Sequence, residues 1–311
     1  MPTTQIPFPV NETLTGVVVA FKNDNLVADR VLPEMTVLSK KYNYIEYPKG
    51  MLFTIPETRV GRKSMPNQPD FEGEKKTDTV DDRGLMDFIP QDDIDEALET
   101  VDPRSLVAEW LTNLIDLDRE VKAANVVFAP GTYLAGQQEE LTGTDRFDDP
   151  ANSKPIEVIS DALEVPLIRP NRIVFGSKVW TNFRRHPKIV EAIVATGAKE
   201  GMVSRQAVAE LFEVDEVIVG QSRLNVAKKG QDVNLQRVWG NHISLVHIDP
   251  TASTQRGITF GGTPRFKQRF AGNWQDMKPG TEGGEWVKVA DHFHEKIFAP
   301  DLGYFIQNAV S

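Results

Sequence analysis

The sequence predicts an α+β protein, and three observations favour that class. Alternating apolar and polar residues, typical of strands, occur in the first 90 residues and again from residue 250 to the end. One long stretch, 104–127, repeats apolar residues at helical spacing instead. Between these parts, residues 155–249 mix helical and strand patterns, which predicts a compact unit of the α/β or α+β type.

Composition narrows the class of protein further. The 311 residues suit two modest domains or one domain with large excursions, and 40% hydrophobic residues predict a mostly globular chain. A net charge of −10 argues against a dedicated nucleic-acid binder, but not against a protein that encloses nucleic acid. The chain has no cysteine, and it has neither a signal-peptide pattern nor an apolar run long enough to span a membrane. We therefore expect a protein that is cytosolic or assembles in the cytosol.

The N-terminal third predicts an extended segment followed by a hairpin arm. Residues 1–24 are rich in Pro and Thr, with a short strand predicted at 16–21. Strands are also predicted at 39–48, where tyrosines alternate, and at 50–60, where Pro56 favours an edge position. A polar run follows before apolar residues return near residue 85. Two strands separated by a long polar segment are typical of a β-hairpin arm that projects from the globular part of a protein.

The polar run 59–80 has too few apolar side chains to fold alone. Its clearly buriable residues are Val60, Met65, Phe71 and Val80, and they cannot offset the entropy lost when the run is ordered. The run is therefore either disordered or ordered by another molecule's surface. Its charged residues, candidates for contact with a neighbouring subunit, are Arg59, Arg62 and Lys63 before the tip and Asp70, Glu72, Glu74, Lys75 and Lys76 after it. From these residues alone, a subunit contact and a solvated loop of mixed charge are equally supported.

A long helix is the clearest element in the sequence. A short acidic helix is predicted just before it, and Asp102 and Pro103 have the residue types of an N-cap and a first helical residue. The helix that follows would be about 30–36 Å long and would serve as a structural spine. Its predicted core stripe consists of Val107, Trp110, Leu114, Leu117 and Val121. Leu111 and Ile115 lie on a neighbouring stripe that ends at Asp118.

The second half predicts several shorter elements. Helices are expected at 155–165, around Trp180 to Ile189 with a break at Pro187, and after an N-cap at Ser204. Strands are expected at 171–176, 215–221, 223–228 and, as one long strand, 237–248, with a turn at 228–231. The last 62 residues, 250–311, predict strands joined by Gly-rich loops.

No motif in the sequence predicts catalysis or a cofactor. The dipeptide Gly-Lys is absent, so there is no P-loop, and no G-x-G-x-x-G, G-x-S-x-G or H-E-x-x-H pattern occurs. His292 and His294 would share one face of a strand, but no carboxylate sits at ligand spacing beside them, so surface or interface histidines are favoured over a metal site. We predict no catalytic residue, no cofactor and no metal.

Several segments, in this order, resemble the major capsid proteins of tailed bacteriophages, whose HK97-like fold also occurs in encapsulins. They are the run Ala28-Asp29-Arg30 with Pro33, the aromatic strand KYNYIEYP, the segment PNRIVFGSKVWTNFRRHPKIVEAI, and Ala299-Pro300-Asp301 before Gly303-Tyr304. The resemblance implies an N-terminal arm over 1–45, anchored by Ala28, Asp29, Arg30 and Pro33, and an extended hairpin arm (the E-loop) over 46–90. It also implies a peripheral domain formed by 91–154 and 251–311 around the spine helix, and an axial domain over 155–250.

The resemblance also implies a function. Proteins of this family self-assemble, as hexamers and pentamers, into an icosahedral shell around double-stranded DNA without reading its sequence. We expect this chain to be a virion protein assembled in the bacterial cytoplasm, with a separate scaffold protein, a portal and, as a further candidate, a cement protein as partners, and with no membrane. Two alternatives stay open: an encapsulin-like compartment shell, and a soluble α/β enzyme with a mobile lid at 59–80.

Overall fold

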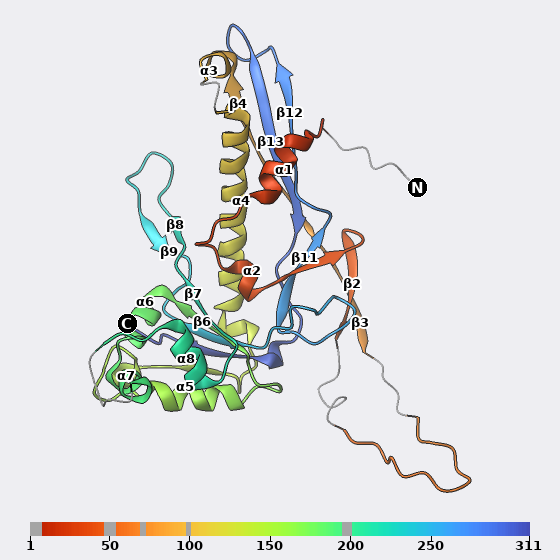
Figure 1. Ribbon diagram of the computed structural model, residues 1–311, viewed down its shortest axis with the longest axis vertical. Coiled ribbons are helices and arrows are strands. Elements are labelled where there is room, and N and C mark those ends of the chain that lie inside the picture. The colour runs from red at the N-terminus through yellow and green to blue at the C-terminus, as the bar shows by residue number, and fades with distance from the viewer. Residues whose placement is uncertain (1–7, 47–53, 69–72, 98–100, 195–200) are drawn as a thin grey trace.

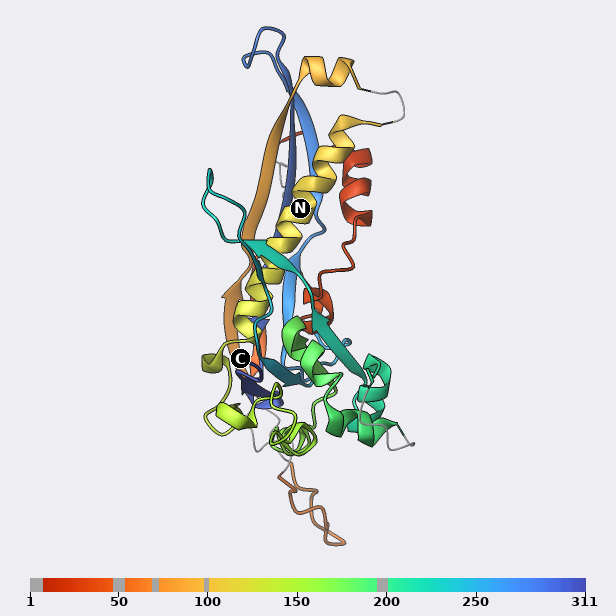
Figure 2. The ribbon, with the colours of Figure 1, turned by 90° about the vertical axis from the view of Figure 1, so that its left-hand side faces the viewer.

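The computed structural model describes residues 8–46, 54–68, 73–97, 101–194 and 201–311. The α-helices are α1 (Glu12–Ala20), α2 (Ala28–Val31), α3 (Gln91–Asp95), α4 (Pro103–Val127), α5 (Pro155–Glu164), α6 (Ser177–Phe183), α7 (Pro187–Ile193) and α8 (Arg205–Phe212), with short 3-10 helices at Pro130–Thr132, Gly143–Asp145 and Pro300–Leu302. The strands are β1 (Glu34–Val37), β2 (Lys41–Glu46), β3 (Glu74–Thr79), β4 (Asp81–Pro90), β5 (Gln138–Glu140), β6 (Arg172–Gly176), β7 (Glu216–Gly220), β8 (Arg223–Asn225), β9 (Leu235–Arg237), β10 (Ile243–Val246), β11 (Gly261–Phe266), β12 (Phe270–Asp276), β13 (Gly284–Phe293), β14 (Lys296–Ile297) and β15 (Gly303–Gln307). Long strands run beside α4 along the long axis, and α5 to α8 gather toward one end (Figures 1 and 2).

A long six-stranded sheet forms the elongated part of the body. Its main path is β1-β11-β13-β12, with β14 paired to β11 and β4 paired to β13 along the whole of both strands. Helices α1 and α4 cover one part of this sheet. The buried cluster between them contains Leu14 and Val18 of α1, Leu111 and Ile115 of α4, and Val287 of β13. Burial of these apolar surfaces holds the helix along the sheet.

A five-stranded sheet, β5-β15-β10-β6-β7, lies between two apolar layers. Ile173 and Phe175 of β6 belong to the core beneath α5 to α8, whereas Val174 belongs to a second core with the C-terminal end of α4 and with α2. Because both faces of the sheet are buried, β6 consists almost entirely of apolar residues rather than alternating.

Most of the predicted helix boundaries are confirmed. The Asp102 carboxylate accepts a hydrogen bond from the Arg104 backbone N–H at 3.2 Å, and Pro103 is the first residue of α4. Ser204 caps α8 by accepting from the Ala207 N–H at 3.1 Å. The predicted break at Pro187 falls between α6 and α7, where Pro187 begins the second helix.

Three strand predictions are wrong for described residues. Residues 16–21 lie mostly in α1, because Asn11 caps that helix and places Leu14 and Val18 together on its buried side. The predicted long strand 237–248 is interrupted and contributes to β9 and β10 instead. Residues 54–60 form no strand, and the earlier part of that prediction lies outside the described residues.

The predicted core stripe of α4 is also wrong. Trp110 is 52% exposed, and Val107, Leu114, Leu117 and Val121 are only half-buried. The residues of α4 that are buried are Ala108, Leu111, Thr112, Ile115, Arg119, Glu120, Ala123, Ala124 and Val127. Small alanines let the helix approach its neighbours closely, and the polar residues among them are buried because they have partners. The buried face of α4 therefore cannot be identified from the spacing of its large apolar residues alone.

Two strands pair with strands outside the domains that the sequence predicts for them. Residues 81–90, placed in the hairpin arm by the sequence, form β4 and pair with β13 inside the long sheet. Strand β15, placed in the peripheral domain, instead lies between β5 and β10 in the five-stranded sheet. Strands β4 and β15 both pair with strands that are distant in the sequence. The local residue pattern therefore does not indicate which sheet each strand joins.

The buried face of α4 observed in the structure predicts that truncating two leucines of this helix changes the free energy of unfolding by different amounts. Leu111→Ala, at a side chain 2% exposed, should lower the free energy of unfolding of the unassembled subunit by about 2–5 kcal/mol, because it leaves a cavity against the sheet. Leu106→Ala, the same change at a side chain 55% exposed on the same helix, should cost less than about 1 kcal/mol. Denaturant unfolding measures both, and equal losses would contradict the assignment.

Candidate functional site

The most prominent feature outside the body is a projecting arm, whose described parts are β2, β3 and residues 54–68 (Figures 1 and 2). Strands β2 and β3 pair antiparallel from Lys41 opposite Thr79 to Glu46 opposite Glu74. Beyond this ribbon, residues 54–68 are exposed at every position, and Ile55 and Met65 are 89% and 87% exposed. The described residues beyond the ribbon therefore form no core of their own.

The base of the arm is packed firmly against the body. Val37, Tyr42, Tyr44 and Val80 form a buried cluster that also contacts Phe266 and Phe298. Burial raises the pKa of the Tyr42 hydroxyl, and the nearby Asp78 carboxylate adds to that shift. Asp78 in turn pairs with Lys296 of β14 at 2.8 Å. The ribbon is thus fixed in direction by its packing against the body, whereas the described residues 54–68 beyond it are exposed.

The predicted contact residues of the arm differ in their surroundings. Arg59, Arg62 and Lys63 are exposed, and none forms an ion pair with any acidic residue that the structure describes. Glu74 and Lys75 are exposed on β3, whereas Lys76 pairs with Glu46 across the ribbon, and this hydrogen bond raises the pKa of Lys76. Asp70 and Glu72 lie outside the described residues.

The four predicted anchoring residues of the N-terminal segment all contact the body. The Ala28 N–H donates to the Glu120 carboxylate at 2.7 Å, and Asp29 pairs with Arg119 at 2.5 Å. Arg30 donates to Glu216 at 3.0 Å, while the Pro33 carbonyl accepts from the Thr263 N–H at 2.8 Å.

The buried carboxylate of Glu120 joins three separate segments. It accepts hydrogen bonds from the backbone N–H groups of Val27 and Ala28 at 2.9 and 2.7 Å, from the Ser222 hydroxyl at 3.0 Å and from the Trp239 indole at 2.6 Å. Burial raises the pKa of Glu120, and the four donors oppose that shift. Ser222 precedes β8 and Trp239 follows β9, so one side chain of α4 holds the N-terminal segment and both legs of the β8–β9 ribbon.

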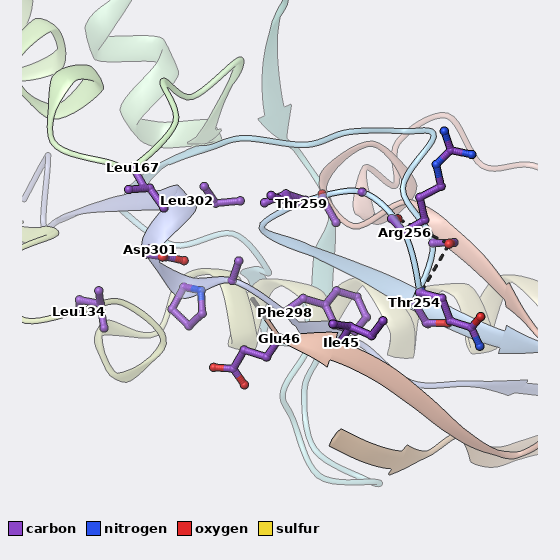
Figure 3. A pocket seen from close by; sticks show the side chains of 16 residues that line it. Ile45, Glu46, Leu134, Leu167, Thr254, Arg256, Thr259, Phe298, Asp301 and Leu302 are labelled. Carbon is purple, nitrogen blue, oxygen red and sulfur yellow. Dashed lines mark hydrogen bonds between the residues drawn. The ribbon is translucent and has the colours of Figure 1, made fainter. Parts of the chain in front are cut away.

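A pocket of about 190 Å³ lies at the base of the arm (Figure 3). Ile45 and Glu46 of β2 line one side of it, and Thr254, Phe298 and Leu302 line others. The Ile45 N–H donates to the Thr254 carbonyl at 3.2 Å. Its lining brings together no nucleophile and base, so the pocket is best described as the seam between the arm and the body.

The histidines considered as metal ligands have acidic partners instead. His292 lies 2.7 Å from Asp82, and His294 lies 3.4 Å from Asp81. Among the described residues no group of His, Asp or Glu has an arrangement that could hold a metal ion. Within the same ranges, no helix has the length and apolar character needed to cross a membrane.

The beginning of α4 is tied to the long sheet by a half-buried ion pair. Glu285 of β13 accepts from Arg104 at 2.8 and 2.6 Å and from the Asn273 amide at 2.7 Å. The hydrogen bonds from Arg104 hold the pKa of Glu285 below its ordinary value of 4.5. This contact fixes the orientation of the α3–α4 end relative to the sheet.

The overall fold matches solved structures from phages and from a virus-like particle. A phage-related protein from Bordetella bronchiseptica RB50 superposes with a TM-score of 0.74 at 20% identity, over 98% of both chains. The capsid protein of cyanophage P-SCSP1u gives a TM-score of 0.57 at 11% identity, over 93% of this chain and 89% of that one. A virus-like particle from Pyrococcus furiosus gives 0.52 at 9% identity, over 95% and 98%. The fold is that of the HK97-like capsid proteins.

Sequence comparison then gives the family. No family model matches the chain. The major capsid protein of Pseudomonas phage JBD67 is 42% identical over 305 residues, covering 98% of both chains. That of Burkholderia phage BcepMu is 23% identical over 303 residues, covering 96% of this chain and 95% of the relative. The chain belongs to the phage major capsid proteins, and it is a structural protein of the capsid of a virion, where copies of it associate into the shell.

Two features of the site were not found from the sequence. Glu120 stands next to Arg119 inside a helix, and only its unusual position among buried residues distinguishes it. The β8–β9 ribbon was predicted as strands and a turn, but its exposure was not. The available signal was its composition, because Arg223, Lys228, Lys229 and Arg237 lie within one short segment.

The junction at Glu120 predicts a large effect of an isosteric change. Glu120→Gln replaces an oxygen acceptor by an amide donor that faces two other donors, so it should lower the free energy of unfolding by about 2–5 kcal/mol. Glu109→Gln is the matched control, since the Glu109 side chain has no ion pair or hydrogen bond with described residues of the same helix or its neighbours. Thermal and denaturant unfolding of the unassembled subunit measure both changes. Similar losses for the two variants would show that Glu120 is not a junction.

The ion pair at Glu285 predicts a pH dependence. Because the pKa of Glu285 is lower in the folded chain than its ordinary value of 4.5, its ion pair stabilises the fold above that pH and is lost as the pH falls below it. Glu285→Gln should therefore be less stable than the original chain by about 1–3 kcal/mol at neutral pH, and this difference should shrink as the pH is lowered below 4.5. Unfolding curves over this range provide the measurement. A difference that is independent of pH would refute the assignment.

Proposed function

We propose that the chain builds an icosahedral shell of hexamers and pentamers around the double-stranded DNA of a tailed phage, and that the shell assembles in the cytoplasm of a bacterial host. Membership of the phage major capsid proteins supports a phage shell over an encapsulin-like compartment. The net charge of −10 suits a container whose surface must not adhere to packed DNA. The role is structural, and we assign the chain no catalytic activity.

The observation that carries the proposal is the exposed arm. The base of the ribbon is packed against the body, and the described residues 54–68 beyond it are exposed at every position. We infer that the arm lies on a neighbouring copy, which orders residues 54–68 by covering Ile55 and Met65 and by pairing Arg59, Arg62 and Lys63 with acidic groups. The arm residues Glu74 and Lys75 are exposed beside this surface.

The domain division follows the family resemblance with two changes that strand pairing supports. We propose that the N-terminal arm is 1–45 and the hairpin arm 46–80, with 81–90 joined through β4 to the peripheral domain. The axial domain would be built on 155–250 and would include β15 from the C-terminal segment. Ala28, Asp29, Arg30 and Pro33 would anchor the N-terminal arm through the contacts described above.

The proposed partners, apart from other copies, come from the phage itself. They are a separate scaffold protein, a portal and, as a further candidate, a cement protein on the outer surface. The experiments on assembly therefore use the chain expressed together with its neighbouring genes.

Charge reversal in the arm tests the proposal. The triple variant Arg59→Glu, Arg62→Glu and Lys63→Glu should remain folded, because these exposed side chains make no ion pair within the described part of the subunit. It should nevertheless form at least about tenfold fewer closed particles, since like charges would meet at the neighbouring surface. Electron microscopy and sedimentation count the particles, and circular dichroism reports the fold.

A charge-preserving variant serves as the control for this test. Arg59→Lys, Arg62→Lys and Lys63→Arg keep the sign of all three charges and should assemble at nearly the original yield. Normal particles from the reversed variant would show that the arm's basic residues do not contact a neighbour.

A further inference from the structure

A second exposed ribbon leaves the body on the side of α4. Strands β8 and β9 pair antiparallel, with Arg223 directly opposite Arg237, and the ribbon projects beside the helix (Figures 1 and 2). Its two legs are held at the base by Glu120, through Ser222 and Trp239. The direction of the ribbon is therefore fixed by the body, while its own residues have little to pack against. We name residues 223–237 the basic ribbon.

The basic ribbon carries an unbalanced positive charge. Arg223, Lys228, Lys229 and Arg237 are accompanied in this segment by a single acidic residue, Asp232, in a chain whose net charge is −10. None of these cations forms an ion pair with the residues that the structure describes. Partial burial lowers the pKa of Arg237, and the facing Arg223 adds to this effect. Like charges directly opposite on paired strands destabilise the ribbon unless an anionic partner lies against them.

The same ribbon exposes aliphatic side chains. Val226, Val233 and Leu235 are 44%, 70% and 53% exposed, and the segment contains no aromatic residue. A two-stranded ribbon of this kind is only marginally stable alone. Cations mixed with aliphatic groups fit a protein surface, because single-stranded nucleic acid is usually bound by aromatic stacking and duplex phosphates need no aliphatic contacts.

A complementary surface exists on the same chain at the α3–α4 end. We define this acidic end by its exposed carboxylates, which are those of Asp92, Asp93, Asp95, Glu96 and Asp102. Residues 84–103 contain no Lys or Arg. Apolar side chains lie exposed next to it, with Leu106 and Trp110 of α4 at 55% and 52%. The surface thus offers both an opposite charge and an apolar patch to the basic ribbon.

We propose that the basic ribbon of one copy binds the acidic end of another copy in the shell. Within one subunit no ion pair joins the two described surfaces, and α3 lies at the far end of α4 from the five-stranded sheet where the ribbon begins (Figure 1). Each surface is already held by the body, the ribbon at Glu120 and the acidic end at Arg104–Glu285. Binding therefore costs little conformational entropy, because both surfaces are already held in place, and this favours association. The inference rests on the shell-forming function and is independent of the contact made by the arm.

A charge swap tests this contact in the full chain expressed with its neighbouring genes. Lys228→Glu with Lys229→Glu should leave the subunit folded but reduce closed particles at least about tenfold. Asp92→Lys with Asp93→Lys should have the same effect alone. All four changes combined should restore most of the particle yield, because the opposite charges meet again. Lys228→Arg with Lys229→Arg keeps the charge and should assemble normally.

Three outcomes would overturn the proposal. A normal yield of stable particles from the ribbon variant would show that its charges are not needed for assembly. Loss of assembly in both double variants without rescue in the combination would show that the two surfaces do not bind each other. A normal yield of particles that retain less DNA would assign the ribbon to the packaged nucleic acid instead. Because the arm residues are unchanged in all these variants, failure here would leave the arm contact standing.

Discussion

The hydrogen bonds accepted by Glu120 are the interaction on which the arrangement of the subunit depends. One carboxylate on α4 accepts from backbone N–H groups at the start of α2, from Ser222 directly before β8 and from Trp239, two residues after β9. An ionised carboxylate can accept four hydrogen bonds at once, and no neutral side chain of similar size can do so. The N-terminal segment, the spine helix and the two legs of the β8–β9 ribbon are therefore fixed relative to one another at one buried carboxylate.

A second set of buried charges holds α4 to the long sheet. Asp291 is fully buried and accepts from Arg265 and Arg269 at 2.6 and 2.9 Å, and Arg269 also pairs with Asp116 of α4. The buried Asp291 is thus paired with two arginines, as the cost of burying a charge requires. In contrast, Arg59, Arg62 and Lys63 of the arm and the cations of the basic ribbon form no ion pair with the residues that the structure describes, and exposed aliphatic side chains lie beside them. The buried carboxylate of Asp291 thus gains its partners when one copy folds. The exposed cations and aliphatic side chains stay available for contacts between copies when the shell assembles.

The sequence predicted the parts of the fold that depend on local interactions. The cap at Asp102, the break at Pro187 and the cap at Ser204 are set by neighbouring residues, and they are where the pattern placed them. Long-range pairing was not accessible in this way, and so the pairing of β4 with β13 and of β15 with β5 and β10 was not predicted. The buried face of α4 was missed because alanines and paired polar residues, rather than large apolar ones, pack against the sheet.

For the site, the sequence identified a segment without a core of its own, but it could not show that the base is rigid. The most direct test of the account is hydrogen exchange at residues 54–68, compared between the unassembled subunit and the complete particle. If neighbouring copies order the arm, its amides should exchange rapidly in the subunit and at least about tenfold more slowly in the particle. Equally rapid exchange in both states would show that the arm stays solvated in the shell and would contradict the account.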